Sequence, residues 1–466
     1  MPVKRVPLVG TTTTRDGISS KDQRFINCYP EAFDKEHLFV TKRAGLAQTY
    51  AKTAGEGRGI TTFNSHLYFV IDDTIYKDGS ALGTTLSSSS GRCYFARRGG
   101  GTPLLLINDK SDLYTLNTSD TLTTVSDIDY PGTTVAGLEH LDQYVFVMDS
   151  DGSVYNSNVN APTTWSASDY ITAETIADTG VRITRHVNYI VAFGSESIEF
   201  FYDAANASGS PLSLMEGTVL LTGCSSGDTV VNMGQEILFV AKDQGGGNYV
   251  AKLSGFTVTP ISIKPVDDAL IAAGSNISGT YAYPIRIKGH NFYVLTIPAS
   301  GVAQTWVYDL VDKAWHQWTS YDGSTESYFT GIDATYHNGV VYILDEDNGK
   351  VYSMNSTTYE DDSQIIKMRG VTERIDFASV KNKFANRLTV IGDRDTVSNG
   401  IMQIRWSDDD YVSFSNWRDL DLTSPNPHIT RIGKFKRRAF EYKYEHPSPM
   451  RMEAFELLLR EGHDAS

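Results

Sequence analysis

The hydrophobic positions of the chain fall into short runs that return about every 40 to 50 residues through its first three-quarters. The clearest copies lie at Gly57–Asp78, Val135–Tyr155 and Gly331–Tyr352. Each copy predicts an aliphatic strand, a polar turn, a second apolar strand, an Asp/Gly/Asn turn and a third strand that carries a tyrosine at or near its end. Such a unit cannot bury its own faces, so it has to stack against further copies of itself. The pattern is typical of a β-propeller blade.

The number of units follows from the central apolar strand of each one. Several of these runs, such as LLLI and YVFV, are apolar on both faces, as expected for strands that neighbouring blades cover from both sides. Asp-Gly and Asn-Gly pairs stand where tight hairpins need a positive φ. We predict about seven blades, or six if one weak unit belongs to an insertion. The central strands are expected at Leu67–Ile71, Leu104–Ile107, Tyr144–Met148, Tyr189–Phe193, Ile237–Val240, Phe292–Ile297 and Val341–Leu344.

The two ends of the chain lack the repeat. Residues 1–36 predict an extended N-terminal arm and residues 37–360 the propeller. The strand pair His37–Lys42 and Ala47–Ala51 is expected in the ring, where an N-terminal strand would complete the last blade. Residues 364–461 predict an antiparallel β-sandwich, and residues 462–466 a disordered tail. The predicted fold is therefore all-β, with sandwich strands at Ile365–Val371, Arg387–Ile391, Met402–Trp406, Lys436–Tyr444 and Met452–Arg460.

Composition narrows the range of functions. The net charge of −15 and the isoelectric point near 5.1 disfavour a protein whose main task is to grip phosphate backbones. No run approaches the roughly 18 apolar residues of a membrane helix, and the start of the chain lacks the apolar core of a secretory signal. The three cysteines, Cys28, Cys93 and Cys224, are scattered and predict no disulfide framework, which favours synthesis in a reducing compartment.

Acidic residues are the main candidates for catalysis, because propeller glycosidases use two carboxylates across a sugar. Most aspartates stand at expected turns, however, where Asp bonds its own backbone. The segments Asp149–Gly152 and Asp345–Gly349 resemble the opening of a calcium loop but lack its distal glutamate. Trp406–Trp417 resembles a degenerate Asp-box turn, which is structural. We expect no catalytic residue, no metal ligand and no cofactor.

Two clusters are candidates for partner binding. Trp315, His316 and Trp318 either pack inside a blade or form an aromatic surface contact. A basic cluster stands out in an acidic chain, and it is either a solvated strand face or a patch that docks an acidic partner subunit or meets DNA at a channel mouth. Its members are Arg431, Lys434, Lys436, Arg437 and Arg438.

Several short phrases resemble the tail accessory proteins of short-tailed bacteriophages, also called packaged-DNA stabilisation proteins. They are QRFINCYPE near the start, SESIEFFYDAANASGSPL at Ser195–Leu212, YDLVDKAWHQW, the RWSDDD turn and RIGKFKRR before a final strand. Together with the repeat they span most of the chain. The resemblance is one of layout and short phrases, and it carries no catalytic motif.

The resemblance implies a structural virion protein of the viral tail, made in the host bacterial cytoplasm and without a membrane anchor. Such a hub adds, as a homo-hexamer, below the ring of portal and adaptor subunits after packaging. It caps or lines the DNA channel without reading its sequence, and it offers attachment sites for the tail needle and for tailspikes or fibres.

Two other functions stay open. One is a carbohydrate-binding or glycosidase-type propeller, whose enzymatic form predicts two acidic side chains converging at the centre of the ring, one with a raised pKa. The other is a propeller scaffold for protein contacts, which the tyrosine-rich composition permits.

Overall fold

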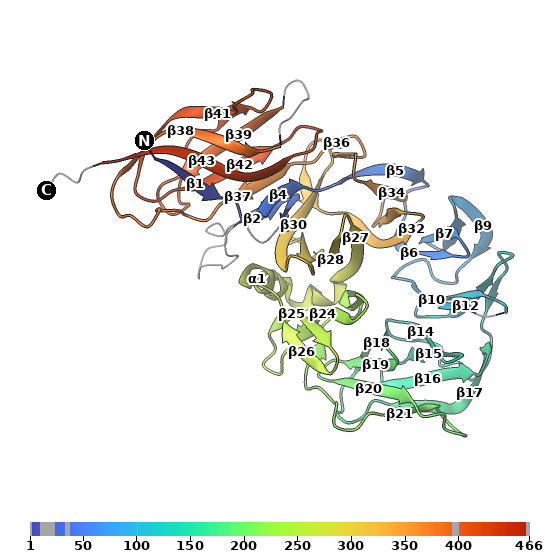
Figure 1. Ribbon diagram of the computed structural model, residues 1–466. Coiled ribbons are helices and arrows are strands. Elements are labelled where there is room, and N and C mark those ends of the chain that lie inside the picture. The colour runs from blue at the N-terminus through green and yellow to red at the C-terminus, as the bar shows by residue number, and fades with distance from the viewer. Residues whose placement is uncertain (1, 10–23, 33–37, 100, 394–399, 463–466) are drawn as a thin grey trace.

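The computed structural model describes residues 2–9, 24–32, 38–99, 101–393 and 400–462. Within these residues the protein is built almost wholly of antiparallel sheets, which form a ring and a second lobe beside it (Figure 1). The all-β class is confirmed. The one α-helix of the described residues is α1 (Lys264–Ala273), which has a proline as its second residue and buries Val266 and Leu270 against the ring.

Four consecutive sheets of four strands each make up the first part of the ring. In each sheet the strands follow one another in chain order, so that every connection is a hairpin. The turn residues Asp78 and Asn338, each followed by glycine, both have positive φ, as the hairpin signals predict. The strands are β6 (Gly57–Phe63), β7 (His66–Ile71), β8 (Thr74–Lys77) and β9 (Ser80–Thr85); β10 (Tyr94–Arg98), β11 (Leu104–Asn108), β12 (Leu113–Asn117) and β13 (Leu122–Thr124); β14 (Glu139–Leu141), β15 (Tyr144–Met148), β16 (Ser153–Asn158) and β17 (Ala161–Thr172); and β18 (Gly180–His186), β19 (Tyr189–Gly194), β20 (Ile198–Asp203) and β21 (Leu212–Leu214).

Three further sheets continue the ring, and the last two also take in strands from other parts of the chain. Sheet five contains β22 (Gly223–Cys224), β23 (Val231–Asn232), β24 (Glu236–Lys242), β25 (Asn248–Ser254) and β26 (Thr257–Pro260). Sheet six contains β27 (Tyr281–Ile287), β28 (His290–Ile297), β29 (Gln304–Asp309), β30 (Ala314–Tyr321) and β31 (Glu326–Tyr328). Sheet seven contains β32 (Gly331–His337), β33 (Val340–Asp345), β34 (Lys350–Asn355), β5 (Gly45–Ala51), β35 (Glu360–Asp361) and β36 (Gln364–Ile365).

Each of the seven apolar runs expected to be a central strand lies in a separate sheet, within β7, β11, β15, β19, β24, β28 or β33. The number of blades nevertheless stays a prediction, because sheet six continues through β30 into strands of the second lobe. The wide spacing between the later units reflects α1, which is inserted between sheets five and six.

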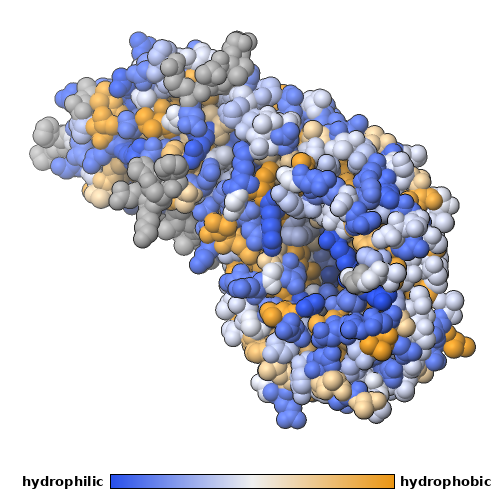
Figure 2. Space-filling model, turned by 45° about the vertical axis from the view of Figure 1, so that its right-hand side comes forward, coloured by the Kyte–Doolittle hydropathy of each residue, from blue (hydrophilic) through white to orange (hydrophobic). Residues whose placement is uncertain are grey.

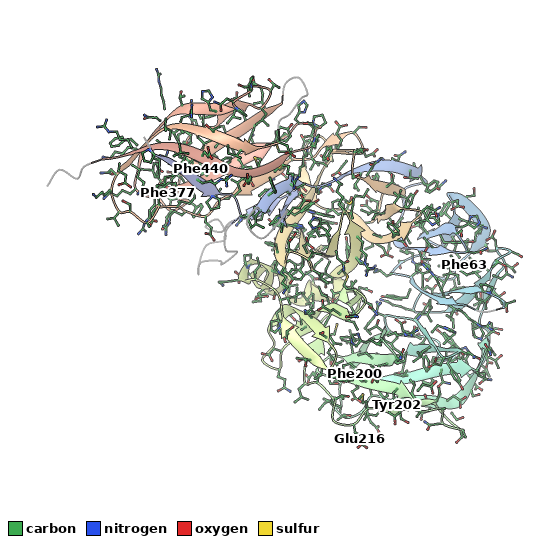
Figure 3. The ribbon with its side chains drawn as sticks, in the orientation of Figure 1. Phe63, Phe200, Tyr202, Glu216, Phe377 and Phe440 are labelled. Carbon is green, nitrogen blue, oxygen red and sulfur yellow. The ribbon has the colours of Figure 1, made fainter. Side chains whose placement is uncertain are left out.

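Neighbouring sheets of the ring share their hydrophobic cores. Val70 and Ile75 of sheet one pack with Leu105 and Ile107 of sheet two, and each following pair of sheets has a core of the same kind. The last core joins sheets six and seven to Phe69 of sheet one. Side chains thus fill the space between the ribbons of the ring (Figure 3). This double-sided burial explains the apolar runs of the central strands.

The ring is closed by a strand from the N-terminal region. β5 pairs with β34 over Gly45–Ala51, as the sequence predicts for a strand that completes the last sheet. Its expected partner is elsewhere, because β4 (Leu38–Lys42) pairs with β3 (Cys28–Ala32) and with the last strand of the chain. The assignment of residues 38–42 to the ring is therefore wrong, and His37 lies outside the described residues.

The second lobe consists of two sheets around one core. One sheet has the order β3-β4-β43-β38-β41, with β1 (Val3–Pro7) also paired to β43 (Arg451–Glu461), and it includes β38 (Lys383–Gly392) and β41 (His428–Phe435). The other sheet has the order β2-β37-β42-β39-β40. Its strands are β2 (Arg24–Ile26), β37 (Met368–Val371), β42 (Ala439–Tyr444), β39 (Ile401–Ser407) and β40 (Arg418–Asp421).

The described N-terminal segments are part of this lobe. Val6 and Phe25 are buried in its core beside Phe455 of β43. The expectation of an extended arm over residues 1–36 is wrong for these segments, because β1, β2 and β3 all pair with other strands. Of the expected disordered tail, residues 463–466 lie outside the described residues.

Candidate functional site

The first strands of neighbouring sheets contact one another around the centre of the ring. The surface is hollowed there, and hydrophilic residues border the hollow (Figure 2). Propellers often place their chemistry at this position, so the side chains at the axis are the first candidates for a site.

Arg92 spans the axis. It precedes β10 of sheet two, yet its Nη1 donates to the carbonyl oxygens of Asp228 and Ala282, at 3.2 and 3.1 Å, in sheets five and six. Its Nη2 lies 3.4 Å from Oδ1 of Asp333 in sheet seven. One guanidinium therefore links opposite sides of the ring. Because these contacts cross the centre of the ring, a DNA duplex cannot pass through it.

The two carboxylates at the axis already hold protein donors. Asp333 accepts the N–H groups of Ile60 at 3.1 Å and Ala334 at 2.9 Å, while Asp228 accepts the hydroxyl of Tyr94 and lies 3.7 Å from Lys110 Nζ. Burial raises the pKa of Asp333, whereas Lys110 and Arg92 outweigh burial and lower the pKa of Asp228. Both aspartates therefore lie near Arg92 at the axis, and one of them has a raised pKa. All four carboxylate oxygens, however, are engaged by the protein itself.

The aromatic cluster expected at a partner contact is buried. Trp315, His316 and Trp318 keep 4%, 1% and 1% of their surface exposed. Trp318 packs on Phe329, with ring centroids 5.2 Å apart, and burial lowers the pKa of His316 to about 3. The interpretation of these three residues as a surface contact is wrong, since β30 is covered on both faces. Their spacing instead reflects packing inside a blade, which was the other interpretation.

The basic cluster divides into two parts. Arg438 is 1% exposed, and both Nε and Nη2 bind the carboxylate of Asp408, at 2.6 and 2.7 Å. It belongs to the core of the second lobe and offers nothing to a partner. The other members are exposed on β41 and in the turn that follows it, and β41 is an edge strand of its sheet. These surface cations are Arg431, Lys434, Lys436 and Arg437.

The aspartate-rich turns are held by their own backbone. Asp149 Oδ1 accepts the N–H groups of Asp151 at 3.0 Å and Ser153 at 2.9 Å, which confirms its interpretation as a turn former. Asp345 does the same for Asp347 and Asn348, each at 3.2 Å. Burial raises the pKa of Asp345 to about 6.

The turn that resembles an Asp-box has the same structural character. Ser407 Oγ accepts the N–H of Tyr411 at 2.9 Å, and Asp409 Oδ1 accepts the N–H of Ser413 at 2.9 Å. The guanidinium of Arg405 stacks on Trp417, 4.4 Å from its ring centroid. These contacts hold the turn in its conformation within the second lobe, so its role is structural.

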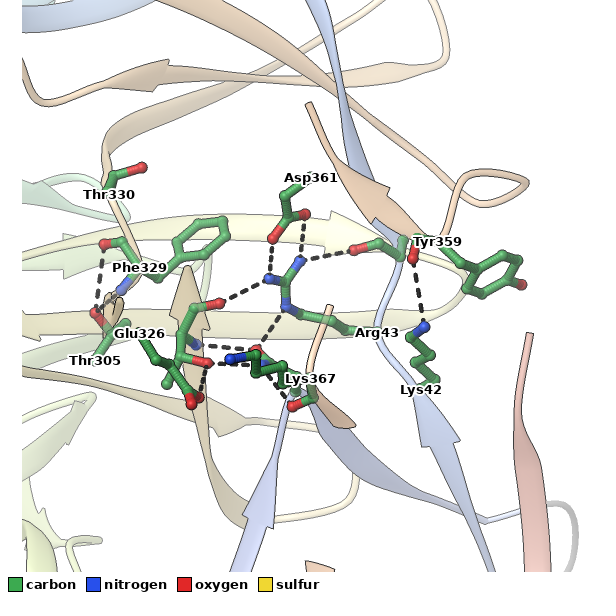
Figure 4. Close-up of polar contacts among 12 residues, drawn as sticks. Lys42, Arg43, Thr305, Glu326, Phe329, Thr330, Tyr359, Asp361 and Lys367 are labelled. Carbon is green, nitrogen blue, oxygen red and sulfur yellow. Dashed lines mark hydrogen bonds and ion pairs between the residues drawn. The ribbon is translucent and has the colours of Figure 1, made fainter. Parts of the chain in front are cut away.

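The junction between the ring and the second lobe was not predicted from the sequence. Arg43, fully buried between β4 and β5, forms an ion pair with Asp361 and donates to Asn27 Oδ1 at 2.9 Å and to the Thr319 carbonyl at 2.9 Å (Figure 4). Asn27 in turn donates to Thr319 Oγ1 at 2.7 Å. Two N–H groups of this side chain reach Asp361 and one reaches Thr319, so Arg43 joins an N-terminal segment to sheets six and seven. These buried and partly buried contacts hold the ring and the second lobe together.

A groove of about 870 Å³ opens on the surface between sheets six and seven. It is lined by the β27–β28 turn, including Arg286 and Lys288, and by Tyr336 and Tyr342 of sheet seven. Tyr336 is 62% exposed. Exposed tyrosines beside basic side chains are typical of protein-binding surfaces.

Comparison with protein families gives one match. The family model described as "Bacteriophage P22 Gp10, beta-propeller" matches residues 5–359. A search of curated protein sequences finds no match. None of the helices in the described residues has the length and apolar character that a membrane span requires.

Solved structures with a similar chain path are distant in sequence. The extracellular domain of BT4673 from B. thetaiotaomicron is 11% identical with a TM-score of 0.45, and the match covers 78% of this chain and 46% of that one. Virginiamycin B lyase from Staphylococcus aureus is 8% identical with a TM-score of 0.43, covering 68% of this chain and 98% of the lyase. The WD40 beta propeller domain of Doa1 is 10% identical with a TM-score of 0.39, and the match covers 67% of this chain and 98% of that domain.

The family match extends from β1 through all seven sheets of the ring, and the sheets have the hairpin order and shared cores of propeller blades. The chain is therefore a β-propeller protein that belongs to the phage stabilisation family of bacteriophage P22 Gp10, and it is a structural protein of the bacteriophage virion.

Proposed function

We propose that this protein is a tail hub that adds below the portal and adaptor ring after packaging and closes the DNA channel. The observation that carries the proposal is the family match over residues 5–359, which takes in the ring and the N-terminal strands of the second lobe. The closed axis refines it: Arg92 links opposite sheets, so DNA has to run outside each propeller. A channel would then lie between copies, and a homo-hexamer would surround it.

The junction between the ring and the second lobe suits a protein that has to resist force in this assembly. A plug has to resist the pressure of packaged DNA without opening between its lobes. The buried contacts of Arg43 join both lobes, and they change little with ionic strength because they are shielded from solvent. The net charge of −15 suits a channel wall along which DNA slides without sticking.

Two surfaces are candidate attachment sites for other tail proteins. The exposed cations of β41 and its following turn lie on the second lobe, where they would meet an acidic partner such as an adaptor subunit. The groove between sheets six and seven lies on the ring, where its tyrosines would receive the needle or a spike or fibre. The two surfaces belong to different lobes, so one copy would bridge two partners.

A glycosidase function has less support. It needs at least one carboxylate oxygen free to protonate a sugar and a second to act on the opposite face. Asp228 and Asp333 both lie near Arg92 at the axis, but each of their carboxylate oxygens has a donor from the protein. Turnover of a panel of glycoside substrates that is lost in Asp333→Asn would reverse this preference.

The test uses DNA-filled heads assembled without this protein. Purified chain is added, the heads are sedimented, and the nuclease-sensitive DNA is measured. We expect the chain to co-sediment and to restore protection of the genome. If the heads retain their DNA without the chain and never bind it, the role as a channel plug is wrong.

A further inference from the structure

Three side chains that can bind a metal meet at the edge of sheet six. His290 begins β28, Asp309 ends β29, and Asp312 lies in the turn that follows. Nδ1 of His290 lies 2.6 Å from Asp309 Oδ2 and 3.5 Å from Asp312 Oδ2. All three ligand atoms lie within 4.8 Å of one another. The exposed fractions of the side chains are only 6% for His290, 2% for Asp309 and 14% for Asp312.

The charges of this cluster do not balance without a further proton or cation. In the described part of the chain, His290 is the one cationic group within ion-pair distance of Asp309 or Asp312. The neighbours from β3 bring no positive charge: the ring of Tyr29 lies 4.7 Å from that of His290, and the N–H of Ala32 donates to Asp312. Two carboxylates that share one imidazole in a buried setting are a common arrangement of metal ligands.

Sheet one contains a natural control for this arrangement. His66 begins β7, and its Nδ1 lies 2.5 Å from Oδ2 of Asp78, in the turn after β8. His66 and His290 each begin the second strand of their sheet, and Asp78 and Asp309 lie at or just after the end of the third strand. The pair in sheet one joins a strand to a turn. It is about 40% exposed, and the described residues around it supply no third ligand. Sheet six therefore differs by burial and by the addition of Asp312.

A second observation comes from His316 on the adjacent strand. Asp309 pairs with Ala314, so His316, two residues further along β30, projects from the same face of the sheet. It is 1% exposed, its Nδ1 lies 3.2 Å from the Val307 carbonyl, and its Nε2 has no hydrogen-bond partner among the described residues. A buried imidazole nitrogen without a partner costs free energy. Because the group of atoms within 4.8 Å of one another does not include His316, only a water between His316 and the ion could link the two.

We propose that His290, Asp309 and Asp312 bind one divalent transition-metal ion, with Zn²⁺ as the best match. Imidazole nitrogen and carboxylate oxygen are both zinc ligands, at about 2.0–2.2 Å from the ion. Two such atoms in a tetrahedral site lie about 3.3 Å apart, and the separations of 2.6 and 3.5 Å lie on either side of this value. The fourth position is open to water. His290 also lines the groove between sheets six and seven, which gives the ion a path from solvent.

The bound ion would strengthen the junction of the two lobes. Asp312 accepts the N–H of Ala32, and Tyr29 packs edge-on against His290, so both contacts run from sheet six to β3 of the second lobe. An ion that holds His290 and Asp312 in place would also hold their contacts with Tyr29 and Ala32 in place. The inference does not depend on the proposed function in the tail.

The test is a calorimetric titration of untagged, EDTA-stripped protein with ZnCl₂, together with its melting temperature. We expect one equivalent to bind and the Tm to rise. Asp312→Asn, which keeps the shape of the side chain, should weaken binding at least tenfold and remove the rise in Tm. Asp78→Asn, the matched change in sheet one, should leave the zinc affinity and the zinc-induced rise in Tm unchanged. Mg²⁺, which prefers an octahedral shell of oxygen ligands, should not produce a one-to-one isotherm.

Absence of saturable one-to-one binding, or equal binding by Asp312→Asn, would overturn the proposal. Circular dichroism of each variant verifies that it is folded. If Asp312→Asn does not fold, His290→Asn serves as the second variant. Co²⁺ provides an independent readout, because its visible absorption on replacing Zn²⁺ reports the tetrahedral ligand field, and Asp78→Asn should retain this absorption.

Discussion

Arg43 and Asp361 lie 318 positions apart in the sequence and form a two-pronged ion pair, in which Nη1 is 2.9 Å from Oδ1 and Nη2 contacts Oδ2. The remaining donors of Arg43 reach Asn27 and Thr319. The planar fork of an arginine can satisfy all of these acceptors at once, whereas the point charge of a lysine cannot. This one side chain therefore fixes how the second lobe sits on the ring.

Arg43→Lys should destabilise the protein by about 3 kcal/mol, because it leaves buried acceptors without donors. Urea denaturation followed by fluorescence measures the loss. Arg5→Lys is the control, since Arg5 pairs with Glu453 at 3.0 Å but is 50% exposed. The control should stay within about 0.5 kcal/mol of the native protein. Equal stability of Arg43→Lys and the native chain would contradict the role of Arg43.

Arg92→Met should destabilise the ring by about 3–5 kcal/mol, because Asp333 would keep a buried charge without its cation. The second change Asp333→Asn should recover part of this loss, since it removes the unpaired charge. Thermal denaturation of the two variants gives the comparison. If the double variant is less stable than Arg92→Met alone, the two side chains are not coupled in this way.

The stability of the protein should depend on Lys42 in a defined pH window. Its side chain is 1% exposed, and burial, with a contribution from Arg43, lowers its pKa from 10.5 to about 7. Between these two values the unfolded chain holds a proton that the folded chain has lost, so stability rises with pH. Relative to Lys42→Met, the native protein should gain about 2 kcal/mol between pH 7 and pH 9. A difference that is constant with pH would show that the Lys42 pKa is ordinary.

Trp318→Ala should lower the stability of the folded protein, and this loss should be seen without any partner. The indole is buried between Phe292 and Phe329. Its removal leaves a cavity and should lower the free energy of unfolding by about 3–5 kcal/mol. The Tm of the purified chain measures this effect without any partner. Tyr336→Ala, at a side chain that is 62% exposed, should change the Tm little. An unchanged Tm in Trp318→Ala would restore the surface interpretation.

Reversal of the exposed cations should affect association and leave the fold intact. Lys434→Glu, Lys436→Glu and Arg437→Glu together should weaken co-sedimentation with DNA-filled heads about tenfold or more at low salt. Added salt should reduce the difference, because exposed charges are screened over a Debye length of about 8–10 Å. Lys264→Glu, at an exposed site on α1, is the control. Heads that bind the triple variant as well as the native chain would exclude this surface from the contact.

The apolar pattern predicts the strands that other sheets cover on both faces. Runs such as Leu104–Ile107 admit few other structures, because burial on both sides demands uninterrupted apolar residues. Val3–Pro7 could not be found in this way, since only Val6 of that strand points inward and its partner lies at the far end of the chain. Lys264–Ala273 was missed for a related reason: its apolar face is short, and the surrounding strands dominate the pattern.

The chemistry of the candidate sites was harder to predict than the strands. Trp315 and Trp318 lie three positions apart on one strand and face opposite sides of the sheet, and the sequence does not distinguish such a strand, buried on both faces, from one with an aromatic surface. Arg92 carries no local signal at all, because its partners come from sheets that are adjacent only after the ring has closed. The same holds for Asp312, whose nearness to His290 depends on the pairing of β28 with β29. A single sequence gives residue types, and the closure of the ring decides which of them meet.

The N-terminal strands have a consequence for how copies of the protein are made. Gly45–Ala51 has to wait for Lys350–Asn355 before it can pair, and Val3–Pro7 has to wait for Arg451–Glu461. The ring therefore cannot close before Lys350–Asn355 has been made, and the second lobe cannot be completed before Arg451–Glu461 has been made. A prematurely ended chain would expose unpaired strand edges and would be a substrate for proteases or aggregation rather than for the virion. The topology thus delays the completion of both lobes until their late strands have been made.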